Sequence, residues 1–192
     1  MRRWLAAIAL ALLPFSAKTA PAAPASVRVV IATDLGNITV ALDLRHAPIT
    51  AGNFLRYVDE KRYDGTSFYR TVRGRDGLVQ GGVDNDIKRT RLPIAHEPTT
   101  LTHLRHIDGT LSMARNEPGS AAGNFFIVIG LGKQLDAAPG YVGYAAFGQV
   151  VAGMGVVKRI QAQPTYPGGF SADMMGQTMS KRVKILGIRR AG

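Results

Sequence analysis

The most informative absence in this sequence is that of cysteine. Without a thiol the chain can form no disulfide, and it offers neither a cysteine nucleophile nor a cysteine ligand for zinc. The sequence also lacks the Gly-x-Ser-x-Gly turn that presents a nucleophilic serine and the Gly-x-x-x-x-Gly-Lys loop that binds phosphates. Hydrolases of that kind and nucleotide-dependent enzymes therefore find no support.

A clear metal-binding motif is also missing. His103 and His106 are three residues apart and could be ligands on one face of a turn, but no third histidine stands at a useful spacing. We therefore interpret both as exposed histidines of a loop. Asp84–Asp86 resembles the start of a calcium-binding loop, yet Arg89 and Ala95 occupy the positions where such a loop needs glycine and glutamate. We expect no metal site.

Acidic residues are scarce, since 13 Asp and Glu stand against 24 Lys and Arg, and the formal net charge is +11. Basic residues cluster at 70–75, 88–91, 181–182 and 189–190. A nucleic-acid-binding protein is one interpretation of this charge. No nucleic-acid-binding motif accompanies the clusters, so we favour a solvated basic surface and expect no nucleic-acid partner.

Long apolar runs are absent except at the N-terminus. Met1–Arg3 is basic, Trp4–Phe15 is almost wholly apolar, and Ala20–Ala22 has the small residues of a cleavage site. This order predicts a secretory signal peptide over residues 1–22. The alternative is an uncleaved N-terminal anchor, which the shortness of the apolar run disfavours.

Removal of this segment would leave a short linker over residues 23–26 and one domain over residues 27–192, a common domain length. The chain is 46% hydrophobic, which is enough for a packed core. We expect a periplasmic or secreted monomer with no membrane span after signal removal.

Periodicity predicts many short strands and two helices. Val27–Thr33 and Ile38–Leu44 are strand-like and flank a turn, so they predict a β-hairpin. Ala51, Phe54, Leu55 and Val58 follow helical spacing after Pro48, which suits a first helical turn. The remaining predicted elements are strands at Ser67–Val72, Leu78–Gly82, Gly109–Arg115, Phe125–Gly130, Tyr144–Val150 and around Val183 and Ile185, a helix at Val151–Ala162, and a long irregular stretch at Val83–Asp108. This pattern is typical of a β-barrel or sandwich.

Five short blocks occur in one order along the chain: Phe68–Arg70, Gln80–Gly82, Leu111–Arg115, Asn124–Ile127 and Ala146–Val150. Together they resemble the cyclophilin family of peptidyl-prolyl cis-trans isomerases, over about residues 27–189. The resemblance implies a mainly-β fold, a closed eight-stranded antiparallel barrel capped by two helices. It also implies an enzyme that acts on proline-containing polypeptides and requires no cofactor.

The resemblance assigns roles to nine residues. Arg70 matches the guanidinium close to the prolyl amide, and Gln80 matches the glutamine that orients it. The residues matched to substrate binding are Phe126, Leu78 and Leu135 in the proline pocket, Ala114, Arg115 and Asn124 along the groove, and Tyr144 at its rim. From the residues alone, Phe125 and Phe126 alternate in a strand, so either could be structural, and Arg70 could be an ordinary surface arginine.

The sequence also departs from the family pattern. Arg70 and Gln80 are two residues further apart than usual, Gly77 and Gln134 replace pocket aromatics, and Tyr144 replaces a histidine. Arg115 replaces an asparagine and Asn124 a glutamine. Two hypotheses follow: an isomerase that acts on exported chains as they fold, or a cyclophilin-shaped binding module or chaperone with little turnover.

Overall fold

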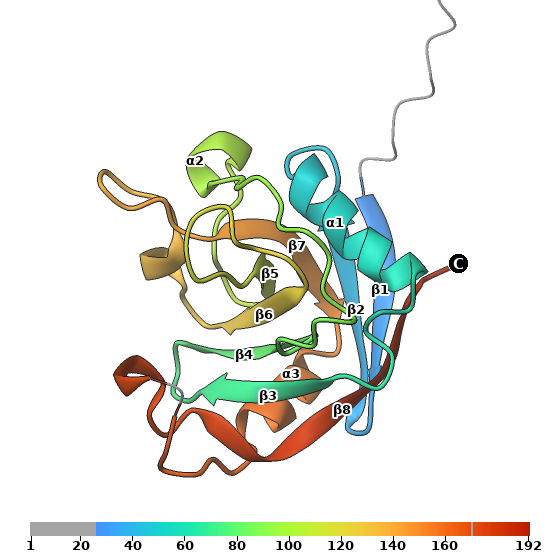
Figure 1. Ribbon diagram of the computed structural model, residues 1–192, viewed down its shortest axis with the longest axis vertical. Helices are drawn as coiled ribbons and strands as arrows, with labels where there is room; N and C mark the ends of the chain where they lie inside the picture. The colour runs from blue at the N-terminus through green and yellow to red at the C-terminus, as the bar shows by residue number, and fades with distance from the viewer. Residues whose placement is uncertain (1–25, 170) are drawn as a thin grey trace, which may run out of the picture.

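Eight antiparallel strands close into a barrel within residues 26–169 and 171–192, which are the part of the chain that the computed structural model describes (Figure 1). The order around the barrel is β1-β2-β7-β5-β6-β4-β3-β8. The strands are β1 Ser26–Thr33, β2 Gly36–Asp43, β3 Ser67–Val72, β4 Gly77–Gly82, β5 Thr110–Met113, β6 Asn124–Ile129, β7 Ala145–Ala152 and β8 Thr178–Arg190. The closed eight-stranded barrel is therefore confirmed, whereas the predicted signal peptide lies outside the described residues.

The first and last strands complete the barrel. β1 pairs with β2 through a tight hairpin, and on its other side Ile31 lies opposite Ile188 of β8. Val29, Ile31, Ile38 and Val40 are fully buried, whereas most residues between them are partly exposed. The predicted period of two in this hairpin is thus confirmed, and one face of each strand lines the core.

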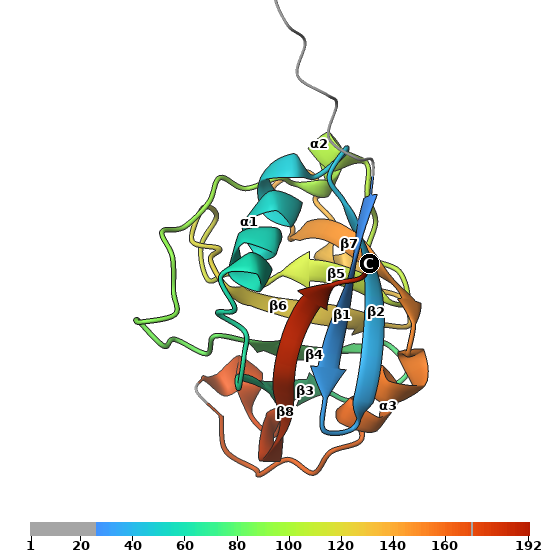
Figure 2. The same cartoon turned by 90° about the vertical axis from the view of Figure 1, so that its right-hand side faces the viewer.

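The helices α1, Pro48–Asp59, and α3, Met154–Gln161, pack on opposite sides of the barrel (Figures 1 and 2). α1 begins at Pro48 as predicted, and the four apolar residues that predicted it, Ala51, Phe54, Leu55 and Val58, are all buried. Ala47 provides no side-chain cap, and the buried carboxylate of Glu97 accepts hydrogen bonds from the backbone N–H groups of Ile49 and Thr50 instead. A negative charge at this end stabilises the helix, because the first N–H groups there lack partners within it.

The second helix is shorter than predicted. The sequence suggests Val151–Ala162, but β7 continues to Ala152 and α3 begins at Met154. Gly153 lies between them with φ 94°, and a side chain there would approach the carbonyl oxygen of Asn37 to 2.4 Å. The turn therefore needs glycine, and the helix can begin only after it.

Other boundaries also differ from the prediction. The stretch Val83–Asp108 contains a one-turn helix, α2, at Thr99–Thr102, and Ser26, predicted to belong to a linker, is already the first residue of β1. The loop between β6 and β7 contains a short 3-10 helix, η1, Lys133–Leu135, and a second one, η2, Ala172–Met174, precedes β8. In the described residues, no helix is long and apolar enough to span a bilayer.

Phe125 on β6 lies at the centre of the core. Its ring meets those of Phe54, Tyr63 and Phe68 edge-on, at centroid distances of 5.3, 5.5 and 5.8 Å. All four side chains are fully buried. Such edge-to-face contacts add to the stabilisation that burial of the rings provides.

We expect Phe125→Ala to lower the free energy of unfolding by about 3–5 kcal/mol, because the core cannot collapse around the lost ring. Leu186→Ala, at a β8 residue that is 60% exposed, should change it by less than about 0.5 kcal/mol. Urea unfolding followed by fluorescence would measure both. A loss of under about 1 kcal/mol for Phe125→Ala would contradict its place in the core.

Candidate active site

A row of outward-facing side chains crosses four neighbouring strands. Strand register places Arg70 of β3 opposite Gln80 of β4, Gln80 opposite Phe126 of β6, and Phe126 opposite Ser112 of β5. We call these four residues the outer row. Directly opposed residues have their side chains on the same face of a sheet. Pairing of the strands alone therefore brings an arginine, a glutamine and an aromatic ring together.

An irregularity in β3 turns Arg70 outward. Phe68 faces the core, and simple alternation would direct Arg70 to the same side. The register shifts between these residues, however: Phe68 lies opposite Gly81 and Arg70 opposite Gln80. Tyr69 is thus the extra residue of a β-bulge, and such bulges re-aim side chains.

Two glutamines hold the Arg70 guanidinium. Nη1 of Arg70 donates to Oε1 of Gln80 at 2.7 Å, while Nε and Nη2 donate to Oε1 of Gln177 at 2.9 and 2.7 Å. Burial lowers the pKa of Arg70, and the neighbouring Tyr144 and Tyr69 raise it. An arginine in this setting stays charged at neutral pH. Because the side-chain amides of Gln80 and Gln177 are neutral, they hold the guanidinium in place without cancelling its charge.

Gln80 is oriented in turn by Tyr69. Its Nε2 donates to the hydroxyl of Tyr69 at 2.9 Å, which leaves Oε1 directed at Arg70. Burial of the phenol raises the pKa of Tyr69 to about 12, so the hydroxyl is neutral at physiological pH. The orientation of the Gln80 amide is therefore fixed by a donor on one side and an acceptor on the other.

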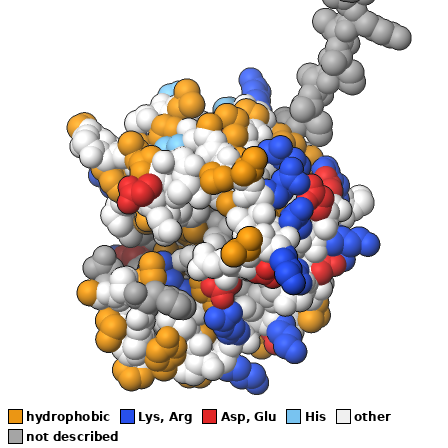
Figure 3. Space-filling model, in the orientation of Figure 1, with side chains coloured by type: hydrophobic (Ala, Val, Ile, Leu, Met, Phe, Trp, Pro, Cys, Tyr) orange, Lys and Arg blue, Asp and Glu red, His pale blue; other side chains and the backbone are white. Residues whose placement is uncertain are grey.

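All nine residues predicted for the site line one cavity of about 400 Å³, here called the Arg70 cavity. Figure 3 shows the surface hollowed at its left side, between the loop around η1 and the segment that contains η2. Ser171 and Met174 of that segment also line the cavity. The predicted members are Arg70, Leu78, Gln80, Ala114, Arg115, Asn124, Phe126, Leu135 and Tyr144.

The two phenylalanines of β6 have different places. Phe125 belongs to the core cluster, whereas Phe126 lies on the outer face with only 3% of its surface exposed. Tyr144 meets the Phe126 ring edge-on at 5.4 Å. Leu78 and Leu135 are half-buried and line the same cavity. Phe126 therefore forms an apolar floor, as the resemblance implied, whereas alternation in the strand alone could not distinguish it from Phe125.

Arg115 and Asn124 also make contacts within the protein. Nε and Nη2 of Arg115 donate to the carbonyl oxygen of Gly143, and its guanidinium lies 4.8 Å from the centre of the Tyr144 ring. Oδ1 of Asn124 accepts from the backbone N–H of Asp84 at 2.9 Å. Both residues thus shape the walls of the cavity, and Arg115 fixes the position of Tyr144.

The departure at Gly77 has a steric cause. A side chain at this position would lie 2.2 Å from the carbonyl oxygen of Val72 and 2.8 Å from the Gln161 side chain. No aromatic residue can stand there in this backbone. Gln134 is exposed and is not among the residues that line the Arg70 cavity.

Two features were not predicted from the sequence. Gln177, whose amide holds Arg70, is 107 residues away in the chain, and no local pattern links the two. His106 was interpreted as an exposed loop histidine, but it is 2% exposed and bonded to Asp136 and Ser112. The described residues contain no group of three or more metal-ligating side chains, and His103 is exposed as expected.

A second cavity, of about 510 Å³, is lined by residues of β2, β7 and the loop after α2. It contains none of the nine predicted residues. Its volume is larger than that of the Arg70 cavity, but it lacks the combination of a held guanidinium and an aromatic floor. We therefore place the candidate active site in the Arg70 cavity.

Known proteins with similar sequences show the family to which this chain belongs. Residues 28–190 match the family model described as cyclophilin type peptidyl-prolyl cis-trans isomerase/CLD. The chain is 39% identical over 168 residues to peptidyl-prolyl cis-trans isomerase A of Dickeya dadantii, covering 85% of this chain and 86% of the relative. It is 38% identical over 170 residues to a peptidyl-prolyl cis-trans isomerase of Acinetobacter baylyi, covering 86% of each.

Among solved structures, a cyclophilin type peptidyl-prolyl cis-trans isomerase of Cryptosporidium parvum, crystallised in the presence of the dipeptide Ala-Pro, shares the fold. The TM-score is 0.71 at 21% identity, covering 86% of this chain and 99% of that chain. The closed eight-stranded barrel is a cyclophilin fold, and the chain belongs to the cyclophilin family. By that membership it is a peptidyl-prolyl cis-trans isomerase.

We expect Gln177→Ala to lower kcat about tenfold, because Nε and Nη2 of Arg70 lose an acceptor and the fork is no longer held. Gln134→Ala, at an exposed glutamine outside the cavity, should leave kcat unchanged. A coupled-protease assay on a prolyl peptide would compare them. An unchanged kcat in Gln177→Ala would mean that Gln80 alone orients Arg70.

Proposed function

We propose that this protein accelerates rotation about X–Pro bonds in exported polypeptides as they fold, with Arg70 as the catalytic group. The observation that carries the proposal is the geometry of the outer row: a charged guanidinium lies beside an apolar floor in one cavity, held by neutral amides. Such a cavity offers a positive donor for the twisted prolyl amide and an apolar surface for the proline ring.

The reaction needs no nucleophile and no proton transfer. An X–Pro bond rotates slowly because amide resonance sets a barrier of about 20 kcal/mol. Catalysis requires interactions that are stronger in the twisted amide than in the planar one. As the amide twists, its nitrogen becomes pyramidal and can accept a hydrogen bond. A positive N–H donor directed at that nitrogen stabilises the twisted form selectively.

Arg70 has the freedom to donate in this way. Its guanidinium carries five N–H donors, and the bonds to Gln80 and Gln177 use part of them. The remaining donors can address the prolyl amide within the Arg70 cavity. Gln80, which also lines the cavity, contributes by holding Nη1 and by its place beside the substrate backbone.

Phe126, Leu78 and Leu135 would hold the proline ring. All three line the Arg70 cavity, and Tyr144 stands against the Phe126 ring. Burial of a proline ring on such a floor contributes about 1–2 kcal/mol of binding. The solved relative crystallised in the presence of Ala-Pro supports a proline-containing ligand for this family. Ala114, Arg115 and Asn124 would border the residue that precedes the proline.

The replacement of a histidine by Tyr144 is compatible with turnover, since no step moves a proton. Tyr144 still forms an aromatic rim, and Arg115 holds it from the other side. The lack of an aromatic side chain at Gly77 should weaken substrate binding rather than the rotation itself. The Arg70 variants test whether this guanidinium carries the turnover.

Arg70→Ala should lower kcat by about 10²–10³-fold, by analogy with the removal of one electrostatic donor from other active sites. Arg70→Lys should restore little of it, because a point charge lacks the planar fork. Phe126→Ala should show the opposite pattern, a raised KM with a smaller effect on kcat. The Phe126 ring contacts the proline ring equally when the amide is planar and when it is twisted. Exchange NMR on a prolyl peptide measures rate and affinity together.

Equal rates in wild type, Arg70→Ala and Arg70→Lys would remove Arg70 from the mechanism. Wild-type protein that binds the peptide without accelerating its exchange would establish the binding-module function instead. The melting temperature of each variant controls for folding. For Arg70→Ala it should change little, because the side chain of Gln80 lines the cavity and solvent can replace its lost partner there.

We further propose that residues 1–22 direct export and that the mature protein begins at Ala23. The support is the order of basic, apolar and small residues in that segment. N-terminal sequencing of the protein recovered from the cell envelope or medium should give Ala-Pro-Ala-Ser as the first residues. Intact Met1 in a cytosolic fraction would overturn the proposal.

A further inference from the structure

A buried histidine lies behind the floor of the Arg70 cavity. The ring of His106 stacks on that of Phe126, with the centroids 6.1 Å apart and the planes inclined by 14°. His106 is on the loop that leads into β5, and it is 2% exposed. The Phe126 ring therefore has two ring neighbours, Tyr144 nearly perpendicular to it and His106 nearly parallel to it.

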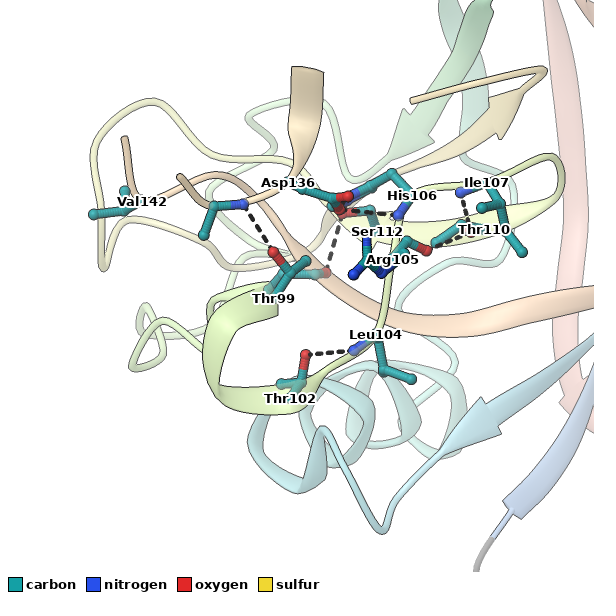
Figure 4. Close-up of polar contacts among 12 residues, drawn as sticks. Thr99, Thr102, Leu104, Arg105, His106, Ile107, Thr110, Ser112, Asp136 and Val142 are labelled. Atoms are coloured by element: carbon teal, nitrogen blue, oxygen red, sulfur yellow. Dashed lines mark hydrogen bonds and ion pairs between the residues drawn. The ribbon is translucent and has the colours of Figure 1, made fainter. Parts of the chain in front are cut away.

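Hydrogen bonds fix the His106 ring at both nitrogens. Figure 4 shows His106, Asp136 and Ser112 grouped together. Nδ1 lies 2.7 Å from Oδ1 of Asp136, which also accepts from the His106 backbone N–H at 3.0 Å. Nε2 lies 2.8 Å from Oγ of Ser112. Because a carboxylate only accepts, Nδ1 carries a proton. The Ser112 hydroxyl lies within hydrogen-bond distance of Nε2 and, at 3.1 Å, of the carbonyl oxygen of Ala145, and its single proton can serve only one of them at a time.

Ser112 belongs to the outer row and lies directly opposite Phe126. His106 is thus attached to the same face of the barrel as the floor that it supports. The sequence of bonds from Asp136 through His106 to Ser112 has the order of a catalytic triad, but Ser112 is 0% exposed and no substrate can reach its oxygen. The cluster is therefore a support, not a second reactive centre.

Asp136 connects His106 to the opposite wall of the cavity. It directly follows Leu135, and the carbonyl oxygen of Leu135 accepts from the backbone N–H of Tyr144 at 2.9 Å. The carbonyl oxygen of His106 accepts from Gly132 N–H at 3.1 Å, so the loop is tied to His106 at two places. One histidine thereby supports the floor and anchors the loop that carries Leu135 and Tyr144.

We propose that His106, held by Asp136 and Ser112, is a positioning residue that sets the shape of the proline pocket. The proposal rests on the proposed function of the Arg70 cavity. Its role is to keep Phe126, Leu135 and Tyr144 at the separation that a proline ring needs. It has no hydrogen bond to Arg70, so it acts on substrate binding and leaves the rotation step to Arg70.

Asp136→Ala and His106→Asn should each raise KM about tenfold while kcat stays within about twofold. If Phe126 is displaced by a fraction of an ångström, it loses contacts with the proline ring that are equal for the planar and the twisted amide. Asp136→Asn should rescue KM, since its amide oxygen can accept both bonds that Oδ1 of Asp136 accepts. His103→Asn is the matched control: this exposed histidine of the same loop has φ 59°, a conformation that asparagine tolerates.

A lowered melting temperature with unchanged KM in Asp136→Ala and His106→Asn would reduce His106 to a structural residue and overturn the proposal. A fall in kcat at constant KM would overturn it too, because that would place its effect on Arg70. If neither variant folds, Ser112→Ala carries the test. It should shift the NMR signals of the Phe126 ring and weaken peptide affinity about threefold, and unchanged signals and affinity would refute the proposal.

The same measurements separate this inference from the proposed function. Wild-type protein that binds an Ala-Pro peptide without accelerating its exchange would refute isomerisation, and the variants would then be compared by peptide affinity alone. If wild type does not bind the peptide, the proposed function fails, and the Phe126 ring signals in Asp136→Ala and Asp136→Asn decide the positioning role. Identical ring signals in wild type and Asp136→Ala would overturn it.

Discussion

The alternation of side chains along β6 is the constraint on which both the core and the active site depend. Phe125 points inward to three aromatic rings, and Phe126 points outward to the Arg70 cavity. A slip of one residue in the register would exchange the two rings, placing the core residue in the cavity and the cavity residue in the core. Packing around Phe125 is therefore what holds Phe126 opposite Gln80 and Ser112.

The surroundings of Arg70 differ from those of other arginines in this basic chain. Arg189 and Arg190 form bidentate ion pairs with Asp64 and Asp59, and Figure 3 shows basic and acidic side chains interspersed on the right of that face. Such pairs orient a guanidinium but offset its charge. Arg70 is held by amide oxygens instead, which preserves the positive potential within the cavity.

Much of the fold follows from local pattern, and the errors have physical causes. The start of α1 could be predicted because Pro48 and the 3.6-residue period of the apolar residues that follow both indicate it. The start of α3 could not be predicted, because the backbone turn before it needs Gly153, and the helical spacing of apolar residues does not reveal such a turn. The nine site residues came from resemblance, and the structure brings them into one cavity. The positions of Gln177 and His106 depend on tertiary contacts between distant segments.

Barrel closure has a consequence for the order of events during synthesis. β1 pairs with β8, whose last paired residue is Arg190, so the two ends of the domain are hydrogen-bonded to each other. Glu97, which caps α1, is likewise made well after that helix. As the chain is made, the edge of β1 stays open and the helix uncapped, and the barrel can close only once nearly the whole chain has emerged. Such non-local pairing makes closure a slow, late step, and until then the open strand edge is available for pairing with another chain.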